Sequence, residues 1–240
     1  MTLKAVLFDF NGVIIHDEPI HQELITQILL QENLRPSVEE FREVCLGRSD
    51  RIAIRDILAR RGRVVTDDYL MQLIQRKTQA YRQQIDTLKE LPSYPGLKTF
   101  AEKVLNAGLV TAVVTGALRS EVELVLDRLT LSDYFPVIVA GDDISVSKPE
   151  PEGYLLALEK LKEHYRDLNL QASECLVIED APAGIEAAKR AGMQVLGIAN
   201  SYPFHMLQRQ TNWCVDYFRD IELDRIQQVF SGTPAQASAS

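Results

Sequence analysis

The sequence predicts an α/β protein in which a block of helices interrupts a parallel sheet after its first strand. From Pro95-Gly96 onward, short apolar runs alternate with segments whose apolar residues recur at helical spacing. Repeated strand–helix units of this kind form parallel sheets with helices on both faces and right-handed crossovers. Residues 16–90 differ, because they show helical spacing and almost no β-rich run.

The first predicted strand is a short apolar run that ends at Asp9. Gly12 follows it and permits a sharp turn away from the sheet. Ligands of open parallel sheets bind at the carboxyl ends of the strands. Asp9 is therefore a candidate functional carboxylate, while an ordinary turn after the strand is the alternative interpretation.

The inserted block at residues 16–90 is expected to contain about four helices. Pro36-Ser37 and Thr66-Asp67 have the composition of helix starts, and Gly62 is typical of a helix end. A helical insert directly after the first strand is placed to act as a lid that excludes water. We therefore expect residues 16–90 to form a helical cap, with a packing unit that does not contact the site as the alternative.

The core is expected to comprise residues 1–15 and 91–230. Its later helices are expected over residues 97–106, 120–129, 152–163 and 183–190, and its later strands over residues 109–115, 137–140, 175–179 and 194–199. Residues 231–240 are small and polar, so we expect them to form a disordered tail.

The composition limits the classes of partner. A formal net charge of -8 argues against nucleic-acid or membrane binding, but it leaves room for a cationic pocket that holds a small anion. We find no leader pattern and no apolar run long enough to span a bilayer, and we expect a cytoplasmic protein. The three cysteines have no metal-ligand spacing, which favours reduced thiols and no zinc site. The sequence does not indicate an oligomeric state.

Polar residues follow three of the later strands. Thr115-Gly116 precedes a helix, where a hydroxyl and helix-start amides can hold a phosphate. Lys148 lies in a proline-bracketed segment that would aim one ammonium group. Glu179-Asp180 puts two acids at a strand end, and Mg²⁺ prefers such oxygen ligands. Singly these are also ordinary caps or surface charges, but together with Asp9 they indicate metal-assisted phosphoryl transfer.

Four segments resemble, in order and spacing, the motifs of haloacid-dehalogenase-superfamily hydrolases. They are Asp9-Phe10-Asn11-Gly12-Val13, Thr115-Gly116, Lys148-Pro149-Glu150-Pro151-Glu152-Gly153-Tyr154 and the stretch from Glu179 to Gly192. The likeness covers nearly the whole chain, and its last motif is the most specific. It is greatest to the helical-capped branch that includes β-phosphoglucomutases and phosphoglycolate-phosphatase-like enzymes. The resemblance implies a Rossmann-like parallel core with an inserted helical cap.

The resemblance also implies catalytic and phosphate-binding roles. Asp9 would be the nucleophile that forms an aspartyl-phosphate. Thr115, Gly116 and Lys148 would hold and neutralise the phosphoryl oxygens.

A metal site is implied as well. Mg²⁺ would be bound by Asp9, Glu179 and Asp180 and by the main-chain carbonyl of Asn11.

In the cap, the loop Gly47-Arg48-Ser49 resembles the one with which mutase-like relatives contact the far end of a sugar phosphate. Arg48 is therefore a candidate specificity residue. His21 and Arg119 are expected instead to lie on the surface or on a helix face.

One position departs from the family pattern. Phosphatases and mutases of this family carry an aspartate two residues after the nucleophile, which protonates the leaving oxygen and then activates water, but this chain has Asn11. An amide cannot shuttle a proton, and general acid–base catalysis contributes about 10² to 10⁴-fold. Dehalogenases and phosphonate hydrolases also lack this aspartate. The pair Glu179-Asp180 argues against a dehalogenase, and neither Lys77 nor Lys89 is obviously placed for the Schiff base of a phosphonate hydrolase.

The sequence therefore predicts an Mg²⁺-dependent phosphatase of a small phosphorylated metabolite. Its catalytic residues would be Asp9, Asn11 and Lys148, and we expect weak activity because of Asn11. One alternative is a β-phosphoglucomutase-like phosphohexomutase, which would suffer more from Asn11 because it needs acid–base help twice. Another is a non-catalytic regulatory protein that binds metal and phosphate. The sequence does not identify the substrate.

Overall fold

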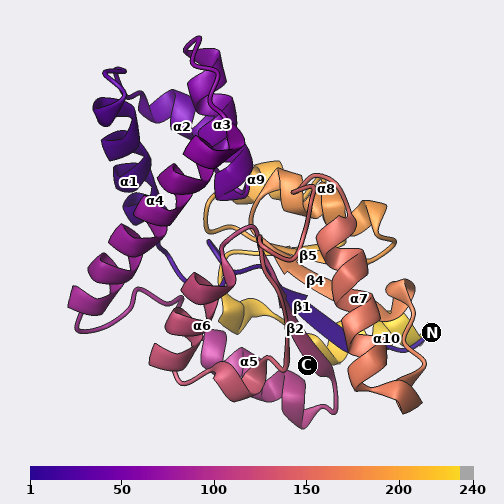
Figure 1. Ribbon diagram of the computed structural model, residues 1–240. Coiled ribbons are helices and arrows are strands. Elements are labelled where there is room, and N and C mark those ends of the chain that lie inside the picture. Colours follow the sequence, from indigo (N-terminus) through magenta and orange to yellow (C-terminus); the bar gives the residue numbers. More distant parts are fainter. Residues whose placement is uncertain (233–240) are drawn as a thin grey trace.

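The computed structural model describes residues 1–232, which form a helix-covered sheet and a bundle of helices that projects from it (Figure 1). The six strands found in these residues are all parallel, in the order β3-β2-β1-β4-β5-β6. They are β1 (Ala5–Phe8), β2 (Val110–Val114), β3 (Val137–Val139), β4 (Cys175–Glu179), β5 (Gln194–Ile198) and β6 (Trp213–Val215). Because β1 pairs with both β2 and β4, the residues that follow these three strands meet at one edge of the sheet.

Helices cover both faces of the sheet (Figure 1). One face is covered by α5 (Leu97–Asn106), α6 (Arg119–Arg128) and α10 (Leu223–Ser231), and the other by α7 (Glu152–His164), α8 (Pro182–Arg190) and α9 (Phe204–Leu207). In β1, Val6 and Phe8 pack into the first core, while Ala5 and Leu7 pack into the second. Burial on both faces explains the continuous apolar runs in the sequence.

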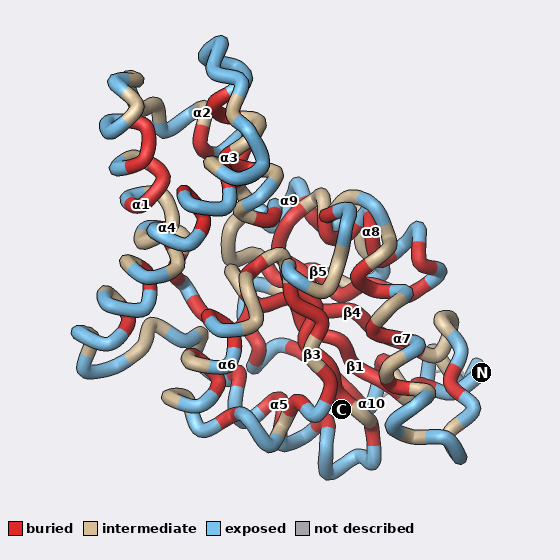
Figure 2. The backbone as a smooth tube through the Cα atoms, viewed as in Figure 1, coloured by how far each residue is buried: buried red, intermediate tan, exposed pale blue. Residues whose placement is uncertain are grey.

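The helical bundle consists of four helices between β1 and α5. They are α1 (Glu18–Gln31), α2 (Val38–Val44), α3 (Asp50–Arg60) and α4 (Asp67–Thr87). The bundle has its own apolar core, to which Ile25, Ile54 and Leu73 contribute. Figure 2 shows that the central strands β1 and β4 are buried along their length, whereas the bundle helices alternate between buried and exposed turns. No helix in residues 1–232 is both long and apolar enough to cross a membrane.

The predicted α/β fold with a parallel sheet is confirmed, and most element boundaries agree with prediction to within about two residues. Ser37 and Thr66 are the N-caps of α2 and α4, because their hydroxyl oxygens accept from Glu40 N and Tyr69 N. The sequence did not predict β6, α9 or α10. The tail was expected to begin at Ser231, but Ser231 ends α10, and residues 233–240 of that expected tail lie outside the described residues.

Candidate active site

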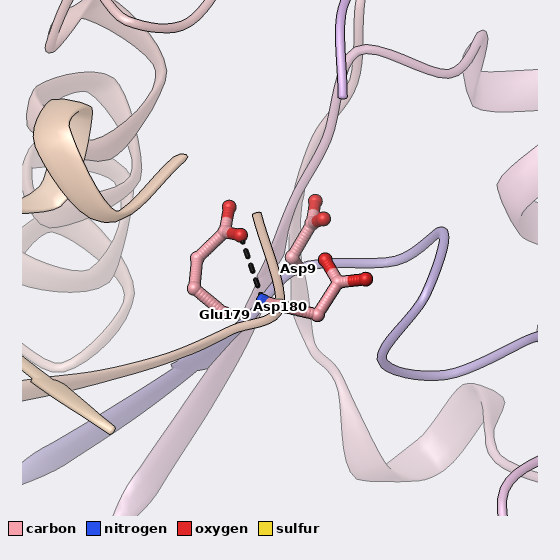
Figure 3. Close-up of side chains that lie close together, drawn as sticks. All are labelled: Asp9, Glu179 and Asp180. Carbon is pink, nitrogen blue, oxygen red and sulfur yellow. Dashed lines mark hydrogen bonds between the residues drawn. The ribbon is translucent and has the colours of Figure 1, made fainter. Parts of the chain in front are cut away.

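Three carboxylates gather at the carboxyl ends of β1 and β4 (Figure 3). Asp9 follows β1, Glu179 ends β4 and Asp180 follows it. One oxygen from each lies within 4.8 Å of the others. All three residues are buried, with exposed fractions of 6% for Asp9, 0% for Glu179 and 2% for Asp180. The structure therefore brings together the three acids that the sequence placed at strand ends.

Two glycines make room for this cluster. Gly12 has a φ of +79°, and a Cβ there would lie 1.9 Å from Asp180 Oδ2. Gly184, in the first turn of α8, would place a Cβ 1.6 Å from Glu179 Oε1. A side chain at either position would displace a carboxylate, so the turn after β1 and the start of α8 both depend on glycine.

Lys148 lies between two of the carboxylates. It comes from the segment between β3 and α7, and its Nζ is 2.6 Å from Asp9 Oδ1 and 2.7 Å from Glu179 Oε1. Burial alone would lower the pKa of Lys148, but the carboxylates of Asp9 and Glu179 raise it above its usual value. Lys148 is therefore a cation held in contact with Asp9, the predicted nucleophile.

Glu179 is the most fully bonded of the acids. Its Oε1 also accepts from the Tyr154 hydroxyl at 2.9 Å, and its Oε2 accepts from the main-chain N–H groups of Asp180 and Ala181. Figure 3 marks the bond from Asp180 N. These donors fix the Glu179 side chain, which in turn helps to hold Lys148.

The cluster has an excess of negative charge. Three ionised carboxylates and one ammonium group give a net charge of -2. Burial and the Glu179 carboxylate raise the pKa of Asp9 to about 7, and burial with the same neighbour raises the pKa of Asp180 well above its usual range. A divalent cation would offset this charge, and oxygen-only donors suit Mg²⁺. The residues therefore fit the metal that the sequence suggested.

Thr115, at the end of β2, faces the same region. Its Oγ1 accepts from Ala117 N at 3.0 Å and lies 3.5 Å from Asn11 Oδ1. The next residue, Gly116, lies directly beneath the bundle loop before α3, because a Cβ on it would be 2.8 Å from Ser49 N. The bundle therefore closes over the sheet edge at this point.

A pocket lies between the sheet edge and the bundle. It is lined from the core by the predicted site residues Asp9, Asn11, Thr115, Gly116, Lys148 and Asp180. Residues of the bundle complete it, and Arg48 is among them. Arg48 Nη1 pairs with Asp56 Oδ2 at 3.1 Å. Arg119 does not line this pocket and pairs with Asp143, as its expected surface position implies.

His21 was expected on a surface or helix face, and that expectation was wrong. Its ring lines the pocket, and Nε2 lies 3.1 Å from Asn11 Nδ2 and 3.3 Å from Asp17 Oδ2. Asp17 is fully buried and accepts from Asn11 Nδ2 at 2.9 Å and from the Tyr81 hydroxyl. The ring of Tyr81 stacks on His21.

The electrostatic surroundings of His21 favour its charged form. Burial and the nearby Lys77 ammonium would lower the pKa of His21, but the carboxylates of Asp17 and Glu121 outweigh them and raise it above 6.5. The protonated form of His21 is therefore stabilised next to Asn11, a feature that sequence reasoning missed.

Lys77 is a further pocket residue that the sequence did not reveal. The sequence gave no reason to place it in the site, yet its side chain is completely buried and lines the pocket. Its position depends on how α4 packs against α3 and α6, which apolar spacing does not reveal.

The family model of haloacid dehalogenase-like hydrolases matches residues 3–192. The chain therefore belongs to this family of hydrolases, as the four motifs suggested. The matched region includes Asp9, Thr115, Lys148 and the pair Glu179-Asp180.

Several relatives are phosphatases by name. A phosphorylated carbohydrates phosphatase of Thermotoga maritima is 29% identical over 201 residues, which cover 83% of this chain and 87% of the relative. A phosphoglycolate phosphatase of Pectobacterium atrosepticum is 28% identical over 91% of both chains. The solved structure of β-phosphoglucomutase from Clostridium difficile has a TM-score of 0.81 at 22% identity, covering 96% of this chain and 98% of that one. This structural likeness supports the fold.

Proposed function

We propose that this protein is an Mg²⁺-dependent phosphatase that hydrolyses a small phosphorylated metabolite through an aspartyl-phosphate on Asp9. The observation that carries the proposal is Lys148 Nζ, held 2.6 Å from Asp9 and 2.7 Å from Glu179 at the sheet edge beside Asp180. Such an arrangement combines a carboxylate nucleophile, a fixed cation and a set of oxygen ligands. The named phosphatase relatives agree with this chemistry.

The substrate phosphoryl group is assigned to the space between Asp9, Thr115 and Lys148. The hydroxyl of Thr115, the main chain at Gly116 and the Lys148 ammonium group would bind its oxygens. Lys148 already contacts Asp9, so a phosphoryl group that it binds lies next to the attacking carboxylate.

Mg²⁺ would be held by the carboxylates of Asp9, Glu179 and Asp180 and by the Asn11 carbonyl. When bound, the ion neutralises charge on the phosphoryl oxygens. Asp9 and Asp180 have fewer protein donors than Glu179, whose oxygens accept from Lys148, Tyr154 and two main-chain groups. We therefore propose that Asp9 and Asp180 would be the principal carboxylate ligands of the ion.

The reaction proceeds in two displacements at phosphorus. An oxygen of the ionised Asp9 carboxylate attacks, the bond from phosphorus to the ester oxygen breaks, and the organic group leaves as an alcohol after its oxygen gains a proton. Water then attacks the aspartyl-phosphate, loses a proton and releases inorganic phosphate. Asp9 is restored.

We assign the proton transfers to His21, because the amide of Asn11 cannot perform them. The His21 imidazolium would give a proton to the leaving oxygen, and the neutral ring would take one from water. Asp17 stabilises the protonated ring, so the transfer is expected to be slow.

We further propose that residues 16–90 act as the cap of this site and that residues 1–15 and 91–230 form the core. The bundle supplies His21 and Arg48 to the pocket and lies against Gly116. Closure by such a cap excludes water from the attacking carboxylate.

Phosphate release tests the proposal directly. A panel of sugar, polyol and aryl monophosphates would be incubated with the protein, with Asp9→Asn and with the charge-matched surface variant Asp68→Asn, each with and without Mg²⁺. We expect release that requires Mg²⁺, is lost in Asp9→Asn and is retained in Asp68→Asn. Release that survives Asp9→Asn would contradict the proposal. If no ester releases phosphate but metal binding is retained, the second candidate is favoured, namely a non-catalytic protein that binds metal and phosphate. Asn11 is the reason for considering this candidate.

A further inference from the structure

A buried charge cluster lies where the bundle meets the core, away from Asp9. Lys77 of α4 has its Nζ 2.7 Å from Oδ2 of Asp50, the first residue of α3, and 4.0 Å from Oε1 of Glu121 in α6. The exposed fractions of the Lys77 and Glu121 side chains are 0% and 1%. Both Asp50 and Lys77 line the pocket, so this cluster forms part of the wall that faces the organic portion of a bound ester.

The cluster carries no net positive charge. Both carboxylate oxygens of Glu121 are buried and have no hydrogen-bond partner within residues 1–232, and Lys77 is the cation that comes within 4.0 Å of one of them. Burial raises the pKa of Glu121, whereas Lys77 lowers it. With Glu121 protonated the three groups sum to zero, and with Glu121 ionised they sum to a negative charge. Lys77 is therefore not free to accept an anion.

The other described charged residues of this wall also leave no cation free to accept an anion. Among the described residues that line the pocket, the lysines and arginines are Lys148 at the reaction centre, Lys77 and Arg48. Arg48 pairs with Asp56 at 3.1 Å. The rest of the wall includes apolar side chains, among them Ile25, Phe41 and Leu46. His21, which also lines the pocket and whose protonated form is favoured, pairs with Asp17 at 3.3 Å. An anionic group in this half of the pocket would thus meet cations that are already paired with carboxylates, together with apolar surface.

We infer that the Asp50–Lys77–Glu121 cluster selects phosphate monoesters whose organic part is neutral and hydroxyl-bearing, and rejects those that carry a carboxylate or a second phosphate. This inference rests on the proposed phosphatase function. A hydroxyl can donate to Asp50 and accept from Lys77 without breaking their ion pair. An anion would have to draw Lys77 away from two carboxylates and leave them buried and unpaired.

Matched substrate pairs test this selectivity. Glycerol 3-phosphate carries a hydroxymethyl group where 3-phosphoglycerate carries a carboxylate, and the two esters are otherwise the same. Glucose 1,6-bisphosphate differs from glucose 1-phosphate by one additional phosphate group. We expect kcat/KM to favour the neutral member of each pair by about tenfold or more, because like charges in contact oppose binding. Dissociation constants with Mg²⁺ present, measured by calorimetry on the same protein, should favour the same members.

Three variants locate the effect. Asp50→Asn removes one partner of Lys77 and should reduce the preference for the neutral member by about tenfold. Glu121→Gln should act in the same direction. Asp68→Asn removes an exposed acid from α4 and should leave the preference unchanged, so a general effect of net charge is excluded.

The outcomes separate this inference from the proposed function. Turnover that is equal for both members of each pair, or better for the anionic ones, overturns the inference and leaves the phosphatase proposal standing. Binding that favours the neutral members without any turnover supports the selectivity and overturns the phosphatase proposal. Absence of both binding and turnover overturns both.

Discussion

The side-chain amide of Asn11 lies next to a carboxylate that accepts a hydrogen bond from it. Its Nδ2 donates to Asp17 Oδ1 at 2.9 Å, and Asp17 is fully buried. An aspartate at position 11 would put two carboxylates in contact, which is costly in a buried place. Asn11 thus stabilises the ionised form of Asp17, and together with Tyr81 and His21 it lowers the pKa of that carboxyl despite burial.

Replacement of Asn11 by aspartate is predicted to raise phosphate release by about 10²-fold or more, because a carboxyl group can move the proton that an amide cannot. The same change is predicted to lower Tm, increasingly so as the pH rises, since contact with Asp17 raises the pKa of the new carboxyl. Steady-state assays and thermal melts across pH measure the two effects. A folded Asn11→Asp protein with an unchanged rate would contradict the role given to this position.

The His21→Gln variant is predicted to release phosphate about 10²-fold more slowly than the unaltered protein, since glutamine cannot donate the proton. His21 acts first as an acid, so the rate should fall as the pH rises through its raised pKa, and this limb should vanish in the variant. The imidazolium also adds stability that is fully present below pH 6.5 and is lost as the pH rises through the folded-state pKa. The exposed His205→Gln serves as the control, and identical pH–rate profiles for both variants would refute the assignment.

Sequence reasoning located the groups that follow strands, but it missed those carried by helices of the bundle. Asp9, Thr115 and Asp180 were found because the carboxyl ends of adjacent parallel strands meet. His21 and Lys77 were missed because their positions depend on the orientation of α1 and α4 relative to the sheet. The spacing of apolar residues shows which face of a helix is buried, but it does not give the orientation of that helix relative to the sheet.

The contact between the loop before α3 and the end of β2 links the bundle to the core. A Cβ on Gly116 would lie 2.8 Å from Ser49 N and 2.9 Å from Ser49 Cα, so any side chain there would push the two loops apart. Both contacted atoms are main chain and cannot move aside by a rotamer change. The absence of a side chain at Gly116 therefore allows the loop before α3 to approach the end of β2 closely.

Gly116→Ala is predicted to reduce kcat/KM by about 10²-fold, because a small displacement of the bundle misplaces the groups that the bundle contributes to the pocket. Tm is expected to change little, since the clash lies between the two parts and not within either core. Kinetics and thermal melts on one preparation check both statements. Normal kinetics would show that closure at this loop is not required.

Element boundaries were predictable where a residue with a specific backbone preference marks them. Gly108 follows α5 with a φ of +73°, and Ser37 and Thr66 cap their helices through side-chain bonds. In contrast, β6 has three half-buried residues at the edge of the sheet, so it lacks the apolar run that identified the inner strands.

For the molecule as a whole, metal and pH are predicted to act on stability together. The pKa of Asp9 is raised from 3.8 to about 7 in the folded state, so its contribution to the free energy of unfolding is present at low pH and is lost as the pH rises through about 7. Mg²⁺ should reverse this loss and add about 2.7 kcal/mol at about 100 times its Kd. Thermal melts with EDTA or Mg²⁺ across pH test this, with Asp180→Asn abolishing the metal effect. A Tm insensitive to Mg²⁺ would contradict the metal site.

The global architecture followed from the sequence because one pattern change, from helical spacing to strand–helix alternation, separates the bundle from the sheet region. How the two parts meet did not follow. The pocket arises from contacts between residues far apart in the chain, such as Lys77 with Glu121 and Gly116 with Ser49. Such contacts are decided by packing and charge in three dimensions.

Covalent labelling of Asp9 is the most direct test of the proposed mechanism. The protein would be mixed with Mg²⁺ and a hydrolysed monophosphate whose phosphoryl group is radiolabelled, quenched in acid within one turnover and digested for peptide mapping. We predict label on the peptide that contains Asp9, lost on treatment with hydroxylamine and absent from Asp9→Asn. Rapid phosphate release with no labelled peptide, or label on another residue, would contradict the account.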